Sequence, residues 1–169
     1  ATHTGRFTTL HFSSSVDLGQ GKISNSGTIT FDTISASGAV AINLGTGTGS
    51  GNVTINAITT TGAFSLVGDQ GSDLTLKNVT ASAGITVTMG SGSITASSFQ
   101  TDGVFSMTKA LGSGETAVIQ DIHSATNATI TLTGGSGHVS ANVIDVGGFT
   151  FNASSQNNTN GTGADEAHH

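Results

Sequence analysis

The stretch GNVTINAITTTG, residues 51–62, alternates apolar and polar side chains and then runs through three threonines into a glycine. One residue separates Val53 from Ile55, and Ile58 follows after two further residues. Alternation with a period of two is typical of a β-strand that buries one face, and glycine favours a turn. Taken alone, the stretch predicts one strand with a bend. Its recurrence along the chain decides the fold.

The same pattern of an apolar pair followed three residues later by another apolar residue occurs six times. The steps between successive sets are unequal and range from about 20 to about 24 residues, as expected of a repeat array that tolerates insertions in its turns. This first column consists of Ile29/Phe31/Ile34, Val53/Ile55/Ile58, Leu74/Leu76/Val79, Ile94/Ala96/Phe99, Ala117/Ile119/Ile122 and Val139/Ala141/Ile144. Gly5, Phe7 and Leu10 fit the same column one step before Ile29, Phe31 and Ile34, so the N-terminal segment predicts an incomplete coil.

A second apolar column lies between these sets and keeps nearly the same spacing. From Val40 onward, its steps lengthen and shorten in the same order as those of the first column. This column consists of Val16/Leu18, Val40/Ile42/Leu44, Phe64/Leu66, Ile85/Val87/Met89, Phe105/Met107, Ala128/Ile130/Leu132 and Phe149/Phe151. Because two independently chosen columns share one irregular register, we infer a structural repeat of about 22 residues.

Such a repeat predicts an all-β fold, a parallel β-helix (β-solenoid) of right-handed sense with about 22 residues per coil and six to seven coils. Each unit reads as a strand, a glycine-rich turn, a second strand, a bend and a short third stretch. A hairpin meander or β-sandwich is the alternative, but its strands need not keep two columns in register. We expect a single domain over residues 1–155. Residues 156–169 form a polar tail, and their end resembles the start of a purification tag.

The composition excludes several functional classes. Four Lys and Arg residues against ten Asp and Glu residues give a formal net charge of −6, so the basic surface that nucleic-acid binding requires is missing. The chain has no cysteine, which excludes disulfides and thiol catalysis. No apolar run is long enough for a membrane-spanning helix. We therefore expect neither a nucleic-acid partner nor a membrane span.

Catalytic residues are not evident either. His123 and His138 are expected on the exterior of different coils, without a nucleophile or a paired carboxylate nearby. The four basic residues are dispersed, and tyrosine and tryptophan, which usually stack on sugars, are absent. The expectation is a protein that is not an enzyme and has no clear small-molecule substrate.

Threonines occupy the outward positions between the first-column residues. Stacked coils would bring Thr30, Thr54, Thr75 and Thr95 into a surface ladder. A purely structural explanation suffices for such a ladder, because threonine favours β-strands and its hydroxyl gives the outer face a polar surface. Regular threonines on a flat β-solenoid also resemble ice-binding proteins, and this resemblance implies paired threonines in every coil. Three coils have such pairs, Thr28/Thr30, Thr86/Thr88 and Thr129/Thr131, whereas others have Asn52/Thr54, Asp73/Thr75 and Ser106/Thr108 instead.

The segment GDQGSD, residues 68–73, is a possible calcium site. Calcium takes several oxygen ligands from carboxylates and carbonyls, and Asp69 and Asp73 supply two carboxylates in one turn. A solvated turn explains the same residues. Calcium is thus the one cofactor that the sequence suggests, and calcium-dependent or ice binding is the alternative to a structural role.

The units GSGNVTINAITTTGAFSLVGDQGSDLTLKNVTASAG and GSGHVSANVIDVGGFTFNAS resemble repeats of large bacterial surface proteins. They are similar to the β-helical shafts of filamentous-haemagglutinin-like adhesins and to the solenoid regions of surface-layer proteins. The resemblance implies an extracellular, non-enzymatic scaffold.

The two ends of the repeat array suggest how such a scaffold assembles. A partial coil with Phe7 and Leu10 stands at one end, and a lone final strand with Phe149 and Phe151 stands at the other, with no amphipathic helix to cover it. We expect these ends to associate head to tail, either between copies or with adjoining coils of a longer chain. A filament, matrix fibre, surface layer or adhesin shaft would result.

Overall fold

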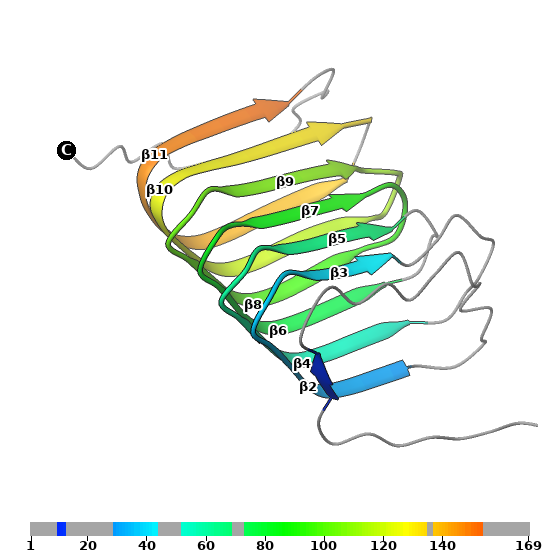
Figure 1. The fold of residues 1–169 in the computed structure, drawn as a ribbon. Coiled ribbons are helices and arrows are strands. Elements are labelled where there is room, and N and C mark those ends of the chain that lie inside the picture. The colour runs from blue at the N-terminus through cyan, green and yellow to red at the C-terminus, as the bar shows by residue number, and fades with distance from the viewer. Residues whose placement is uncertain (1–9, 13–28, 44–51, 69–72, 135–136, 154–169) are drawn as a thin grey trace, which may run out of the picture.

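A computed structural model describes residues 10–12, 29–43, 52–68, 73–134 and 137–153. Within these ranges the regular structure is entirely β-strand (Figure 1). The strands are β1 (Leu10–Phe12), β2 (Ile29–Ala36), β3 (Val40–Asn43), β4 (Val53–Thr60), β5 (Phe64–Gly68), β6 (Leu74–Ala81), β7 (Ile85–Met89), β8 (Ile94–Thr101), β9 (Phe105–Ala110), β10 (Thr116–Thr133) and β11 (His138–Ala153).

The strands form two layers that the chain visits in turn. Pairing runs in the order β1-β2-β4-β6-β8-β10-β9-β7-β5-β3, and β11 pairs with β10. The even-numbered strands β2 to β8 make one layer and the odd-numbered strands β3 to β9 the other, whereas β10 and β11 are long, bent strands that follow both layers (Figure 1). Each described pairing is parallel, so the prediction of a parallel β-solenoid is confirmed and the hairpin alternative is wrong.

The predicted columns coincide with the observed register. In the first column Ile29 pairs with Val53, and the pairing continues through Leu74, Ile94 and Ala117 to Val139. In the second column the pairing continues in the same way from Val40 to Phe149. The predicted repeat is therefore confirmed from each coil to the next along this part of the chain.

One detail of the predicted unit is wrong, because the short third stretch is no separate element. It continues the preceding strand across a bend, as in β4, where Asn56 and Ala57 are both only partly buried and the inward alternation shifts by one residue. Backbone pairing with the next coil resumes directly after the bend, with Ala57 opposite Asn78. The residues before and after the bend therefore belong to one continuous strand. Val16, Leu18, Leu44, the end of the domain near residue 155 and the polar tail lie outside the described residues, and the handedness stays a prediction.

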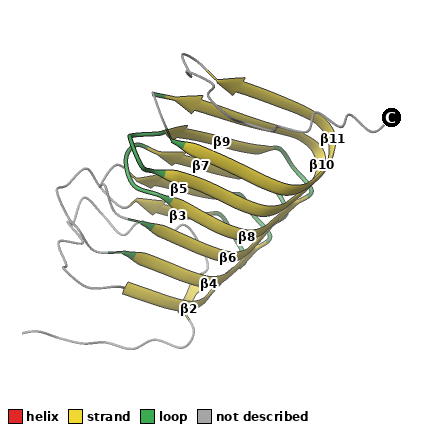
Figure 2. Cartoon of the chain, turned by 180° about the vertical axis from the view of Figure 1, so that it is seen from behind, coloured by secondary structure: helices red, strands yellow, loops and turns green. Residues whose placement is uncertain are grey.

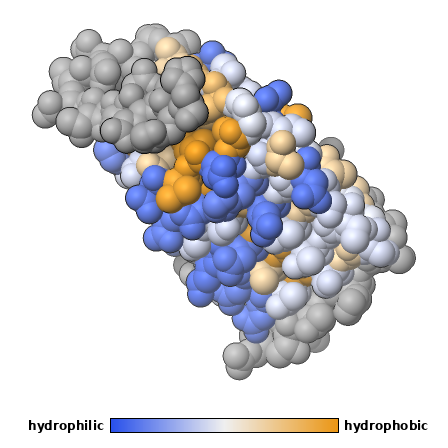
Figure 3. All heavy atoms as spheres, turned by 90° about the vertical axis from the view of Figure 1, so that its left-hand side faces the viewer, coloured by the Kyte–Doolittle hydropathy of each residue, from blue (hydrophilic) through white to orange (hydrophobic). Residues whose placement is uncertain are grey.

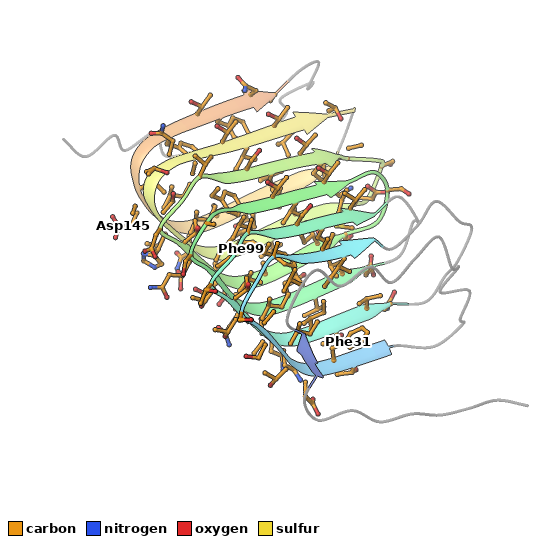
Figure 4. All side chains as sticks on the ribbon, viewed as in Figure 1. Phe31, Phe99 and Asp145 are labelled. Carbon is orange, nitrogen blue, oxygen red and sulfur yellow. The ribbon has the colours of Figure 1, made fainter. Side chains whose placement is uncertain are left out.

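The core lies between the two layers and consists almost entirely of column residues. Phe64, Phe99 and Phe105 are among its largest fully buried side chains. The rings of Phe99 and Phe105 come from opposite layers, and their centroids are 5.0 Å apart. Phe99 and Phe31 both lie on the inner side of the coils, whereas Asp145 projects outward at the bend (Figure 4). Full burial of one such side chain contributes about 1.5–3 kcal/mol, which explains why the columns decide the fold.

The chain passes from one layer to the other at a corner (Figure 2). Buried hydroxyls and closely packed glycines lie at this corner. Thr60, Thr101 and Ser124 are buried there among apolar residues. The Thr101 hydroxyl accepts a hydrogen bond from the Gly103 N–H at 3.1 Å, and the Ser124 hydroxyl donates to the Gly103 carbonyl of the coil below at 2.7 Å. These hydroxyls satisfy backbone groups that the ladder leaves unpaired at the corner.

Gly103 is expected to be required because successive corners approach closely. A Cβ atom at this position would lie 2.7 Å from the Ala83 carbonyl carbon and 2.8 Å from the Gly84 nitrogen, both backbone atoms. Gly103→Ala should lower the free energy of unfolding by about 1–3 kcal/mol, the typical result of overpacking. Urea unfolding measures the change. The adjacent exposed Asp102→Ala is the control and should stay within about 0.5 kcal/mol of the wild type, so equal losses in both variants would contradict the close approach.

Candidate functional site: the open C-terminal coil

The inward face of β11 is largely exposed, unlike the same face one coil earlier. In β10 the column residues are at most 3% exposed. The equivalent residues of β11 are not covered: Ile144 is 36% exposed, Phe149 45% and Phe151 50%. Since their partners in β10 include Ile122, Ala128 and Ile130 in direct register, these side chains hold core positions that lack a further described coil above them.

Exposed apolar surface concentrates at this end. Among the described residues, the exposed large apolar side chains number six, and four of them belong to β11: Val143, Ile144, Phe149 and Phe151. Figure 3 shows hydrophobic surface gathered toward this end of the solenoid, on a side that is otherwise mainly hydrophilic or neutral. Contiguous exposed apolar surface marks an interaction site more often than scattered apolar residues do.

The backbone of β11 is open along one edge. β10 pairs on one side with β8 and β9 and on the other with β11, whereas β11 pairs with β10 alone among the described strands. Its 16 residues, His138–Ala153, therefore present a row of N–H and C=O groups to which no described strand is bonded. A long open edge of this kind is a template for a further strand.

The predicted association residues divide between the two ends. Phe149 and Phe151 lie on the exposed face just described. Leu10 lies in β1 and pairs with Ile34, which confirms the offset predicted for it. Phe7 lies outside the described residues. The described part of the N-terminal end therefore begins with an incomplete coil, because β1 covers only the last three residues of β2.

The structure assembles the predicted threonine ladder on the outer face of the even-numbered strands. Thr30, Thr54, Thr75 and Thr95 are successive partners in the ladder, and all are exposed or partly exposed. A second set of outward hydroxyls lies on the other layer, where three neighbouring coils bring together the pairs Thr86/Thr88, Ser106/Thr108 and Thr129/Thr131.

The two aspartates of the predicted calcium site are not brought together by any described contact. Asp69 lies outside the described residues. The Asp73 carboxylate accepts a hydrogen bond from the Ser93 N–H at 2.9 Å, and the Asn52 side-chain oxygen accepts one from the Asp73 N–H at 3.2 Å. Asp73 therefore takes part in a side-chain ladder that joins the starts of successive strands. In the part of the chain that the structure describes, no group of three or more His, Asp or Glu side chains could hold a metal ion.

A buried ion pair, which the sequence reasoning missed, fastens the turn between β9 and β10. The Lys109 side chain is fully buried, and its Nζ lies 2.9 Å from Glu115 Oε2. The ammonium also donates to the carbonyls of Gly90 and Ala110. The sequence contains an indication of this pair, because Lys109 occupies the same inward column position as Met89 and Leu132. A charged side chain at such a buried position needs a partner of opposite charge.

Glu115 joins this turn to the turn of the coil before. Its carboxylate accepts N–H groups from Gly92 and Gly112, each at 2.9 Å. Burial raises the pKa of the Glu115 carboxyl, but the hydrogen bonds from Gly112 and Gly92 and the Lys109 ammonium together bring the pKa below its ordinary value. The carboxylate is thus held in its charged form as a structural link between two coils.

His123 and Asp145 form a second polar contact that the sequence reasoning did not foresee. They are partners in the ladder between β10 and β11, and Nδ1 of the imidazole lies 3.4 Å from an Asp145 carboxylate oxygen. The Asp145 side chain is 80% exposed at the last described coil. The pair is too exposed to resemble a catalytic dyad, but it places a carboxylate at the open edge.

Within the described residues no helix has the length and apolar character needed to cross a membrane. No protein-family model, no curated protein and no solved structure matches this chain.

Proposed function

We propose that this chain is a non-enzymatic extracellular structural protein, a self-associating β-solenoid subunit of a bacterial surface filament, matrix fibre, surface layer or adhesin shaft. The observation that carries the proposal is the open coil β11, with core-type side chains exposed on one face and a strand edge beside them to which no described strand is bonded. Both features favour the addition of another coil along the solenoid axis.

The distribution of polar groups supports a structural role. The described polar contacts with long-range partners join neighbouring coils, as the Asp73, Glu115 and Ser124 side chains do. The surface placement rests on the resemblance to adhesin shafts and surface-layer solenoids.

Self-association can be tested by measuring the mass of the protein in solution as its concentration is raised. Sedimentation velocity from micromolar to millimolar protein should show a series of species growing in mass, and negative-stain electron microscopy should show fibres of constant width. Growth along one axis is expected because, among the described strands, those at the two ends of the stack have an edge to which no described strand is bonded. A protein that stays monomeric at millimolar concentration, with the amides of β11 protected from hydrogen exchange, would contradict the proposal.

Ice binding is the second candidate, favoured by the outward pairs Thr86/Thr88, Ser106/Thr108 and Thr129/Thr131 on adjacent coils. Strand spacing places neighbouring coils about 4.8 Å apart, so the pairs make a regular two-dimensional array of hydroxyls. Thermal hysteresis of the monomer should then fall when Thr88 and Thr131 are replaced by Lys. Replacement of Thr54 and Thr75 on the opposite layer tests whether the other ladder is used instead.

A further inference from the structure

We infer that the occupant of the open edge is the N-terminal end of a second copy, with the partner's Leu10–Phe12 strand paired in parallel with Ile144–Val146. This inference rests on the proposed function and adds to it which surfaces meet and in what register. The shape of the edge limits which occupants fit. β11 follows β10 in register from Thr116 opposite His138 to Leu132 opposite Ala153, through an irregularity at the corner.

A straight peptide strand can pair with only one side of such a bent edge. An occupant that uses the whole edge must turn between the layers where β10 and β11 turn. Successive coils of this chain do so, because their corners stack on one another. A chain that repeats this coil can therefore follow the edge, and β1 (Leu10–Phe12) gives the register in which a second copy would begin.

The register of β1 identifies which part of the second copy comes first. Leu10, His11 and Phe12 pair with Ile34, Ser35 and Ala36. The same three columns run through every coil and end at Ile144, Asp145 and Val146. A second copy that continues the ladder by one step would place its residues 10, 11 and 12 over these last three.

The chemistry of the three columns is complementary. In this register Leu10 would pair with Ile144 and Phe12 with Val146, so that an apolar residue type stands opposite an apolar one at both positions. In this register His11 would pair with Asp145 from above, as His123 pairs with it from below. Opposite charges directly across a ladder stabilise the pairing, whereas like charges destabilise it. Asp145 would then select the register of the incoming coil.

Charge reversal tests the register in the full chain. Asp145→Lys places a cation opposite the partner's His11, and at pH 6, where an ordinary imidazole is mainly protonated, the dissociation constant for self-association should rise roughly tenfold or more. His11→Glu should weaken association similarly. The chain carrying both Asp145→Lys and His11→Glu should associate again, because the charges are exchanged. Asp102→Lys is the matched control, since it changes an exposed aspartate of another coil by the same charge.

The outcomes separate this inference from the proposed function. Asp145→Lys also places a cation opposite its own His123, so circular dichroism should verify that this variant stays folded, with at most a slightly lower melting temperature. His11→Glu leaves the contact between His123 and Asp145 intact and is the variant free of this effect. Loss of association in both single variants and its return in the exchanged variant would support the register. Wild-type assembly that both single variants leave unchanged, or that the exchanged variant fails to regain, would overturn the inference alone. A wild type that never associates would overturn the proposed function as well.

Discussion

Replacing Glu115 by alanine should destabilise the fold by about 3–5 kcal/mol, because the change leaves a buried charge without its partner. The Lys109 side chain is fully buried, and Glu115 is the carboxylate that compensates it at 2.9 Å. The N–H groups of Gly92 and Gly112 would lose their acceptor at the same time. Equilibrium unfolding in urea measures the loss as a lower midpoint.

A double variant separates the ion pair from the packing around it. Lys109→Met together with Glu115→Gln removes both charges and keeps an amide oxygen as acceptor for one of the two glycine N–H groups. The methionine repeats the residue type of Met89, which holds the same column position one coil below. Buried ion pairs are often replaced by apolar residues at little loss, so the double variant should be markedly more stable than Glu115→Ala. If Glu115→Ala matched the wild type within about 0.5 kcal/mol, the buried pair would be contradicted.

The same carboxylate gives a direction for the pH dependence. The pKa of Glu115 in the folded protein lies below its ordinary value of 4.5, so its contribution to stability is present above that value and is lost as the pH falls through the folded pKa. The difference in melting temperature between wild type and Glu115→Gln should therefore shrink below pH 4.5. A difference that stayed constant down to strongly acidic pH would argue against a charged Glu115 in the fold.

Two phenylalanines at different heights in the solenoid should respond very differently to truncation. Phe99→Ala should lower the free energy of unfolding by about 3–5 kcal/mol, as the loss of a large core side chain does. Phe99 is fully buried, and its ring packs at 5.0 Å from that of Phe105. Thermal and urea unfolding should both register the change.

Phe149→Ala is the matched variant at the open end. The side chain is 45% exposed, so its truncation should change the stability of the monomer by only about 1 kcal/mol. Self-association should weaken instead, because the aromatic surface that a further coil would cover is smaller. Equal losses of monomer stability in Phe99→Ala and Phe149→Ala would mean that the last coil is covered in solution.

The coil and its register were predictable because the alternation of apolar and polar residues can be read from short segments of the sequence. Val53, Ile55 and Ile58 recur with the same spacing in five other units, and the irregular steps of the two columns match the observed pairing residue for residue. The same argument places Leu10 opposite Ile34, as observed. In a parallel solenoid each inward residue pairs with its own repeat, so a pattern along the chain translates directly into contacts.

The buried charges were not predictable from the same pattern. The sequence presents Lys109 as one of four dispersed basic residues, although it occupies an inward column position. Glu115 follows in a turn, whose path the alternation of the strands does not define. Only the folded turn brings the ammonium, the carboxylate and the N–H groups of two coils within hydrogen-bond distance. The contact of His123 with Asp145 was predictable, because the register that places Ile122 opposite Ile144 also places His123 opposite Asp145 one residue later.

The sequence by itself determined the repeat, the inward columns and the threonine ladder, since each depends on spacing along one chain. The sequence also placed Phe149 and Phe151 at the end of the array, but only the tertiary structure decided how far each of the equivalent positions is covered. Ile122 and Ile144 occupy the same column and have the same side chain, yet the first is buried and the second is exposed. Burial depends on whether another coil lies above a residue, and that is a property of the stack rather than of the repeat.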